Sequence, residues 1–189
     1  LTAITDFDEK YVDANLTLNL GITSSSALSE KYNFRFTLLD SSKKIIVSES
    51  TSIENLSSTL SREIKQPHQW SDEKPYLYNL VIELLYSENE YFEVIKKKIG
   101  FRELEIIDGK ACLNGKPFYI KGVNRHEHHP EYSGTVTKDI MLKDIFLMKQ
   151  NNVNAVRTSH YPNSPLWYEL CDEYGILLQD EVNAECHYK

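Results

Sequence analysis

The first hundred residues alternate between apolar and polar positions, which is the pattern of strands that are buried on one face. In residues 11–20 every second position is apolar over most of the segment, and residues 33–39 repeat this spacing. The segments K-K-I-I-V-S-E, Y-L-Y-N-L-V-I-E-L and Y-F-E-V-I-K-K-K-I follow, with polar turns between them. We therefore predict an antiparallel β-sandwich over residues 1–103, immunoglobulin-like only in architecture, because the sequence lacks the Cys-Trp-Cys core of antibody domains.

The spacing of the apolar residues changes after Phe101. The pair Asn114-Gly115 predicts a β-hairpin turn, because both central residues of such a turn adopt a positive φ. The pattern then predicts five elements, in the order β-α-β-α-β. They are a strand at 118–123, a helix capped by Thr137 with an apolar stripe at Ile140, Leu142 and 145–148, a strand at 153–156, a helix from Ser164 and Pro165 to Gly175, and a strand at 176–180.

This order with short connections implies parallel strands and right-handed crossovers. A doubly wound sheet and a TIM (β/α)₈ barrel both begin this way, and both bind ligands at the carboxyl ends of their strands. The predicted strands end in N-R-H-E-H-H-P (124–130), R-T-S-H-Y-P (157–162) and D-E-V-N-A-E-C-H (180–187). Five of the six histidines of the chain lie in these segments, so we predict an active or binding site at this edge.

Metal and nucleophile chemistry are two interpretations of this edge. The H-E-H-H run is not the H-E-x-x-H zinc helix, but a zinc or two-metal hydrolase remains open. Its ligands would be His126, His128, His160 and His187. Ser159 beside His160 suggests a nucleophile, but sequence neighbours cannot face each other across a catalytic triad, and the chain has no G-x-S-x-G elbow.

A third interpretation is a site for a polyhydroxylated substrate, because imidazoles, amides and carboxylates all bind hydroxyl groups. Retaining glycoside hydrolysis needs two carboxyl groups about 5 to 5.5 Å apart. Glu127, Glu181 and Glu185 are candidates, and their spacing in sequence does not choose between them.

Composition narrows the possible partners. The net charge of −7 argues against nonspecific binding to nucleic acid or to anionic membranes, which requires clustered Lys and Arg. No apolar run approaches the roughly 18 residues of a membrane span, and the N-terminus does not resemble a signal peptide. Three cysteines without zinc-ligand spacing favour a reducing compartment, so we expect a cytoplasmic protein.

Four segments of the second half resemble glycoside hydrolase family 2. They are F-R-E-L-E-I, L-N-G-K-P-F-Y-I-K-G-V-N-R-H-E-H-H-P, L-M-K-Q-N-N-V-N-A-V-R-T-S-H-Y-P-N-S-P-L-W-Y-E-L-C-D-E-Y-G-I-L-L-Q-D-E and N-A-E-C-H. Earlier, P-H-Q-W-S-D-E-K-P-Y-L-Y-N-L resembles the family more loosely, and H-E-H-H-P favours its β-galactosidases. The resemblance implies an immunoglobulin-like domain at 1–103, the first three βα steps of a TIM barrel at 104–189, and retaining hydrolysis through a covalent glycosyl-enzyme.

The resemblance also implies roles for individual residues. His126 and His160 match histidines that contact galactose and support the transition state, and Arg157 matches an arginine that orients the nucleophilic glutamate. Glu185 and His187 match ligands of an active-site Mg²⁺, with Na⁺ as a further candidate cofactor, although imidazole is an unusual partner for Mg²⁺. The supporting residues around them are Asp180, Glu181 and Asn183.

The family's acid/base and nucleophile are glutamates at the ends of barrel strands four and seven. We predict three barrel strands, so we expect neither catalytic glutamate here and interpret the chain as an inactive fragment of a β-galactosidase. The full-length protein is expected to act on β-galactosides as a homo-oligomer, without a nucleic-acid or membrane partner. The alternatives are a β-glucuronidase, a β-mannosidase or a non-catalytic carbohydrate-binding module.

Overall fold

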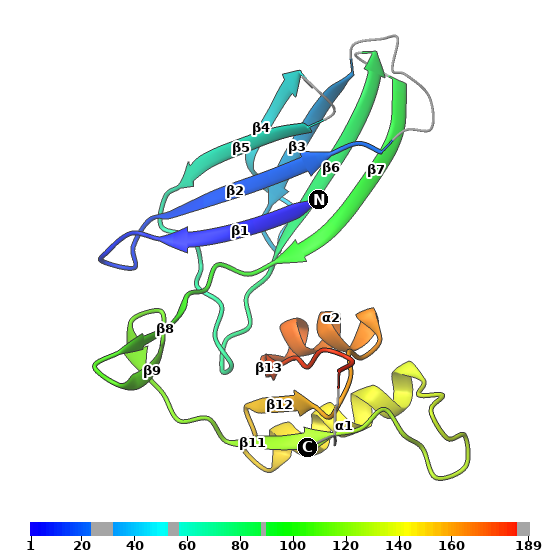
Figure 1. Cartoon of the computed structure of the whole chain (residues 1–189). Coiled ribbons are helices and arrows are strands. Elements are labelled where there is room, and N and C mark those ends of the chain that lie inside the picture. The colour runs from blue at the N-terminus through cyan, green and yellow to red at the C-terminus, as the bar shows by residue number, and fades with distance from the viewer. Residues whose placement is uncertain (24–31, 53–56, 88–89, 185–189) are drawn as a thin grey trace.

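The computed structural model describes residues 1–23, 32–52, 57–87 and 90–184 as a β-sandwich, a small hairpin unit and a parallel α/β unit (Figure 1). The described strands of the sandwich are β1 (Thr2–Phe7), β2 (Ala14–Gly21), β3 (Asn33–Leu39), β4 (Ile45–Ser52), β5 (Ser57–Ile64), β6 (Tyr78–Ser87) and β7 (Glu90–Ile99). The hairpin unit contains β8 (Leu104–Ile107), β9 (Lys110–Leu113) and β10 (Lys116–Pro117). The α/β unit contains β11 (Gly122–Arg125), α1 (Lys138–Gln150), β12 (Ala155–Thr158), α2 (Pro165–Tyr174) and β13 (Leu177–Gln179).

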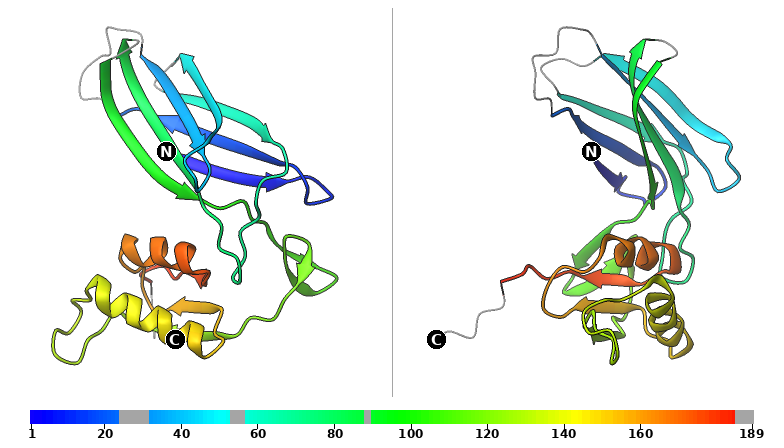
Figure 2. Two further views of the ribbon diagram at one scale, coloured as in Figure 1. Left: turned by 180° about the vertical axis from the view of Figure 1, so that it is seen from behind. Right: turned by 90° about the vertical axis from the view of Figure 1, so that its right-hand side faces the viewer.

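The sandwich consists of two antiparallel sheets, with strand orders β1-β2-β5 and β4-β3-β6-β7. The two views in Figure 2 show these sheets as separate layers. Buried residues alternate with exposed or half-buried ones along β2 and β3, as the sequence pattern predicted. The core between the layers includes Leu16, Leu18, Leu20, Phe34, Phe36, Leu38, Leu80, Ile82 and Leu84. The predicted β-sandwich is therefore confirmed.

Two tight turns shape the hairpin unit. Asn114 and Gly115 have φ values of 50° and 72° between β9 and β10, which confirms the predicted turn. Asp108 and Gly109, with φ values of 50° and 74°, form a second turn between β8 and β9. The Asp-Gly pair has the same turn chemistry as Asn-Gly, so the sequence contained the signal for this second hairpin.

The three strands of the α/β unit are parallel in the order β11-β12-β13, as predicted. The strand expected at 118–123 is wrong in position, because β11 begins at Gly122. The Asn154 side chain donates to the Tyr119 carbonyl (3.0 Å) and accepts the Lys121 N–H (2.8 Å). These backbone groups are therefore satisfied by a side chain, and parallel pairing starts after them.

Both helices contribute to one core with the sheet. Val156 and Ile176 pack in the same cluster as buried residues of α1 and α2. Within α1 the buried residues are Met141, Ile145 and Met148, so the predicted stripe is only partly right. Phe146 and Leu147 are exposed, because consecutive positions cannot all face one side of a helix.

The predicted helix boundaries hold, although the predicted capping chemistry does not. Thr137 and Ser164 occupy the N-cap positions without a side-chain capping hydrogen bond, and Gly175 closes α2 in the left-handed conformation. Among the described residues, no helix is long and apolar enough to cross a membrane.

The loop between β5 and β6 reaches from the sandwich toward the α/β unit (Figure 1). Trp70 in this loop is fully buried, and its indole N–H donates to the Asp172 carbonyl of α2 (2.7 Å). The Asp72 carbonyl accepts from Lys149 Nζ (2.6 Å), and the Asp72 carboxylate accepts from Asn154 Nδ2 (2.9 Å). The predicted domain boundary after residue 103 stays a prediction, since this loop already packs against the α/β unit.

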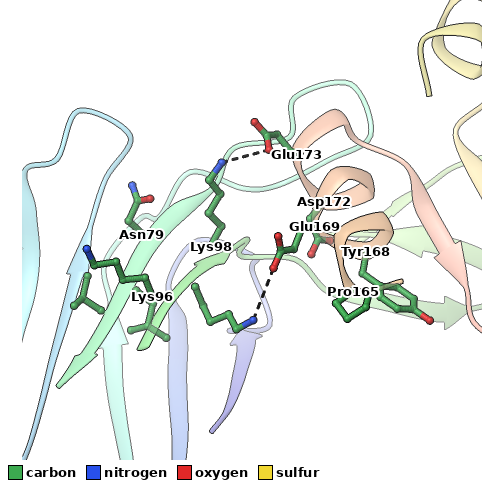
Figure 3. A pocket seen from close by; sticks show the side chains of 11 residues that line it. Asn79, Lys96, Lys98, Pro165, Tyr168, Glu169, Asp172 and Glu173 are labelled. Carbon is green, nitrogen blue, oxygen red and sulfur yellow. Dashed lines mark ion pairs between the residues drawn. The ribbon is translucent and has the colours of Figure 1, made fainter. Parts of the chain in front are cut away.

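A groove of about 560 Å³ lies beside this contact, between β6 and β7 on one side and α2 on the other (Figure 3). Lys97 and Lys98 face Glu169 and Glu173 across it, at 3.9 and 3.4 Å. Such exposed pairs contribute roughly 0–1 kcal/mol each. The buried Trp70 contact, rather than these ion pairs, therefore holds the two parts together.

Replacing Gly175 by Ala is expected to destabilise the fold more than replacing Gly109 by Ala. Both glycines have φ above +70°, so each variant carries the left-handed strain of about 1–2 kcal/mol. At Gly175 the new Cβ would also lie 2.3 Å from the Asp72 carbonyl oxygen, whereas at Gly109 nothing lies within 4 Å. Denaturant unfolding of both variants measures the difference, and equal losses would contradict the packing of α2 against the Trp70 loop.

Candidate functional site

The carboxyl ends of β11, β12 and β13 lie at one edge of the parallel sheet. Arg125 pairs in register with Thr158, and Arg157 pairs with Gln179. The residues that follow each strand therefore meet at this edge, as predicted. Of the eight residues to which the resemblance gives a role, the structure describes six: His126, Arg157, His160, Asp180, Glu181 and Asn183.

Arg157, His160 and Glu181 form a connected group at the edge. Nε and Nη2 of Arg157 both contact Oε1 of Glu181, while Oε2 of Glu181 lies 3.0 Å from Nδ1 of His160. Nη2 of Arg157 also lies 3.3 Å from the same imidazole nitrogen. With a proton on Nδ1, His160 donates to Glu181. The orientation of the imidazole ring is therefore fixed both by its own loop after β12 and by a carboxylate that follows β13.

The electrostatics of this group favour an ionised Glu181. Burial alone would raise the pKa of this carboxyl, but the hydrogen bonds from His160 and Arg157 outweigh burial, so the pKa is lowered. A lowered pKa in the folded state means that the carboxylate stabilises the fold above its unfolded pKa. This contribution is lost as the pH falls through the folded pKa, so acid weakens the site.

The two predicted sugar-contacting histidines lie side by side. The rings of His126 and His160 are 5.5 Å apart between centroids and meet edge to face at 79°. The Tyr161 ring also lies near His126, with ring centroids 6.0 Å apart. The structure therefore places the imidazole that follows β11 next to the imidazole that follows β12.

Asp180 is anchored within the fold. Its Oδ1 accepts hydrogen bonds from the Thr158 hydroxyl (2.9 Å) and from the Tyr168 hydroxyl on α2 (2.9 Å). Burial, followed by the hydrogen bond to Asp180, raises the pKa of Tyr168. Asn183, the remaining described member of the predicted supporting set, is exposed.

Sequence reasoning assigned no role to Arg125 and considered Glu127 only as a candidate carboxylate, yet both are site residues. Arg125 is 6% exposed and donates to Asp144 of α1 (2.9 Å) and to Asn163 (3.0 Å). The carboxylate of Glu127 accepts the Ser164 N–H. The available signal was that these two residues flank His126 in the sequence. That signal does not reveal their hydrogen-bond partners, which are distant in sequence.

The two rival chemistries find little support in this geometry. Ser159 is buried and its hydroxyl has no hydrogen-bond partner among the described residues, while His160 faces Glu181 and Arg157. Within the part of the chain that the structure describes, no three His, Cys, Asp or Glu side chains form a group that could hold a metal ion. That finding covers His126, His128 and His160, whereas Glu185 and His187 lie outside the described residues.

Solved glycosidase structures match nearly the whole chain. A β-glycosidase from Bacteroides vulgatus matches with a TM-score of 0.85 and 30% identity, over 96% of this chain and 23% of its own. A Bifidobacterium dentium β-glucuronidase complexed with coumarin-3-O-glucuronide matches with a TM-score of 0.83 and 28% identity, over 92% of this chain and 27% of its own. The fold is therefore that of a glycosidase.

Family models identify the group more closely. The model for "Glycosyl hydrolases family 2" matches residues 1–102, and the model for "Glycosyl hydrolases family 2, TIM barrel domain" matches residues 104–189. The chain belongs to glycosyl hydrolases family 2. The resemblance seen in the sequence is thus confirmed, and the α/β unit belongs to a TIM barrel rather than to a doubly wound sheet.

The curated relatives include two bacterial β-galactosidases. Those of Photobacterium profundum and Pseudoalteromonas haloplanktis are 53% and 54% identical over 124 residues, which is 66% of this chain. The matched segment spans 12% of each of these relatives.

Replacing Arg157 by Met is expected to raise the pKa of Glu181, because burial is then opposed mainly by the hydrogen bond from His160. Carboxyl ¹³C chemical shifts of Glu181 across a pH series measure this change. Arg62→Met is the matched control, since it removes the Arg62–Glu49 pair on the sandwich and should raise only the pKa of Glu49. An unchanged pKa of Glu181 in Arg157→Met would contradict the electrostatic account of the site.

Proposed function

We propose that the protein carrying this chain is a β-galactosidase that hydrolyses terminal non-reducing β-D-galactose residues with retention. The observation that carries the proposal is the identity of 53–54% to two β-galactosidases over 124 residues. The identity to the Bifidobacterium dentium β-glucuronidase is 28%. The higher identity therefore favours galactosides over glucuronides as the substrates.

The charges at the edge also support a neutral sugar. A uronic acid carries a carboxylate, which favours a cation that is free to pair with it. Arg125 is buried and paired with Asp144, while Arg157 pairs with Glu181 and is the cation that the resemblance assigns to the nucleophilic glutamate. Galactose needs hydrogen bonds to its hydroxyls instead, and the neighbouring imidazoles of His126 and His160 can supply them.

Glu127 and Glu181 are poorly suited to the two carboxyl roles of a retaining glycosidase. Glu127 accepts the backbone N–H of Ser164, and both oxygens of Glu181 are bound by Arg157 and His160. These contacts support positioning roles for both side chains. We retain the prediction that the acid/base and the nucleophile lie outside this chain, together with Arg157 as the residue that orients the nucleophile.

A magnesium ion at Glu185 and His187 remains a proposal that rests on the resemblance. Mg²⁺ prefers oxygen ligands, and the described carboxylates closest in sequence are Asp180 and Glu181. Oδ1 of Asp180 and both oxygens of Glu181 are engaged by protein donors, so these carboxylates add no support for such an ion. A role for Na⁺, a homo-oligomeric state and a cytoplasmic location are likewise proposals from resemblance and composition alone.

A segment exchange tests the function. The matched 124 residues of the Photobacterium profundum β-galactosidase are replaced by those of this chain, and aryl β-galactoside and β-glucuronide are offered as substrates. We expect kcat/KM for the galactoside to stay within about tenfold of the host enzyme, a barrier change of about 1.4 kcal/mol. The 189-residue chain alone should show no turnover. A folded hybrid that prefers the glucuronide would overturn the proposal. Turnover by the chain alone would overturn the prediction that this chain lacks both catalytic glutamates.

Replacing His160 by Ala in this hybrid is expected to lower kcat/KM for the galactoside by about 10²-fold or more, the cost of losing an oriented polar group in a glycosidase transition state. His126→Ala should act in the same direction. His129→Ala is the control from the same histidine run, since its ring stacks on Tyr132 and its N–H binds the Ser133 carbonyl. Equal effects of all three variants would argue against a sugar-contacting role for the imidazole pair.

A further inference from the structure

The carboxylate of Glu127 lies at the N-terminus of α2. Its two oxygens are 3.1 and 3.2 Å from the backbone N–H of Ser164, the N-cap residue, and the side chain is 17% exposed. A negative charge is favourable at this end of a helix, because unpaired N–H groups point outward there. Pro165 follows at the first helical position and has no N–H, so Ser164 is the nearest available donor.

The backbone of Glu127 makes a second contact with the same segment. Its N–H donates to the Tyr161 hydroxyl (3.2 Å), and the Tyr161 ring lies beside His126. Tyr161 and Ser164 both belong to residues 159–164, the segment that carries His160. One residue after His126 thus holds the segment of His160 at two points.

Arg125, the residue before His126, also holds this segment. Its Nη1 donates to Oδ1 of Asn163 (3.0 Å) and lies 3.8 Å from Oε1 of Glu127. Its guanidinium lies 3.8 Å over the ring of Trp167 on α2, and its Nε donates to Asp144 on α1. A buried cation held in this way is rigid, because moving it would leave an uncompensated charge.

We propose that Glu127 is a positioning residue that sets the distance between the imidazoles of His126 and His160 by binding the loop after β12. The effect of Glu127 on galactoside turnover rests on the proposed function, whereas its effect on the positions of the two imidazoles does not. The plain competing explanation is that Glu127 only caps α2. Capping alone predicts a loss of stability on removal of the carboxylate with both rings left in place.

The first test is made on the full chain by NMR of its histidine rings. Glu127→Ala is expected to shift the ring signals of both His126 and His160 and to weaken the Overhauser contact between them. Glu127→Gln, which keeps the shape and an acceptor oxygen for Ser164, should retain most of that contact. Glu131→Ala is the matched control from the same loop, because Glu131 is exposed and should leave both rings unchanged.

Unmoved rings in a less stable Glu127→Ala variant would overturn the proposal in favour of capping alone. If Glu127→Ala does not fold, the shifts in Glu127→Gln decide. The weaker acceptor in Glu127→Gln should then shift both ring signals together, and unmoved rings or movement of one ring alone would overturn the proposal.

The second test measures kinetics in the hybrid β-galactosidase described above. Misplacing a substrate-contacting group by about 1 Å can cost about 10²-fold in rate. We expect Glu127→Ala to lower kcat/KM by about 10- to 100-fold, mainly through kcat, and Glu127→Gln to restore most of the rate. An unchanged kcat in Glu127→Ala would overturn the positioning role. A hybrid that is inactive with its native Glu127 would instead count against the proposed function, and the ring measurement on the full chain would still decide the role of Glu127.

Discussion

The burial of Trp70 against the α/β unit is the contact on which the rest of the described structure depends. The residue comes from a loop of the sandwich, yet it packs with Leu113, Ala155 and Leu177 and donates to Asp172. An aromatic side chain buries about 150–250 Å², which corresponds to about 4–6 kcal/mol at 25 cal/mol per Å². The exposed ion pairs across the neighbouring groove contribute far less. The buried indole is therefore a larger contribution to the relative position of sandwich and barrel strands than these ion pairs.

The same loop sets where the barrel strands begin. Asp72, two residues after Trp70, binds the amide of Asn154, and that amide also binds the backbone of Tyr119 and Lys121. These hydrogen bonds hold the entry to β11 against the entry to β12. A strand rises about 3.3 Å per residue, so fixing the start of a four-residue strand also fixes its far end. The imidazoles of the site lie at that far end, and the sandwich loop thus supports them from the opposite edge of the sheet.

Patterns with short sequence range predicted most of the fold. The alternation in β2 and β3, the turn at Asn114-Gly115 and the end of α2 at Gly175 each depend on a few neighbouring residues, and each was recovered. The start of β11 was missed because it depends on a side chain more than thirty residues away, with Asn154 and Lys121 separated by 33 positions. Parallel strand order predicted that His126 and His160 would share an edge. It could not predict which carboxylate would pair with which cation there, because that depends on side-chain geometry.

Helix α2 contacts the Trp70 loop at one end and Glu127 of the candidate site at the other. Its C-terminal end receives the Trp70 loop through the Asp172 carbonyl and through Gly175, where a side chain would collide with Asp72. Ser164 at its N-terminal end is held by Glu127. A helix of ten residues is about 15 Å long, so these contacts are separated by the length of α2. The same helix thus packs against the sandwich loop at one end and is held at the other by the residue that follows His126, so one element joins the sandwich contact to the edge of the site.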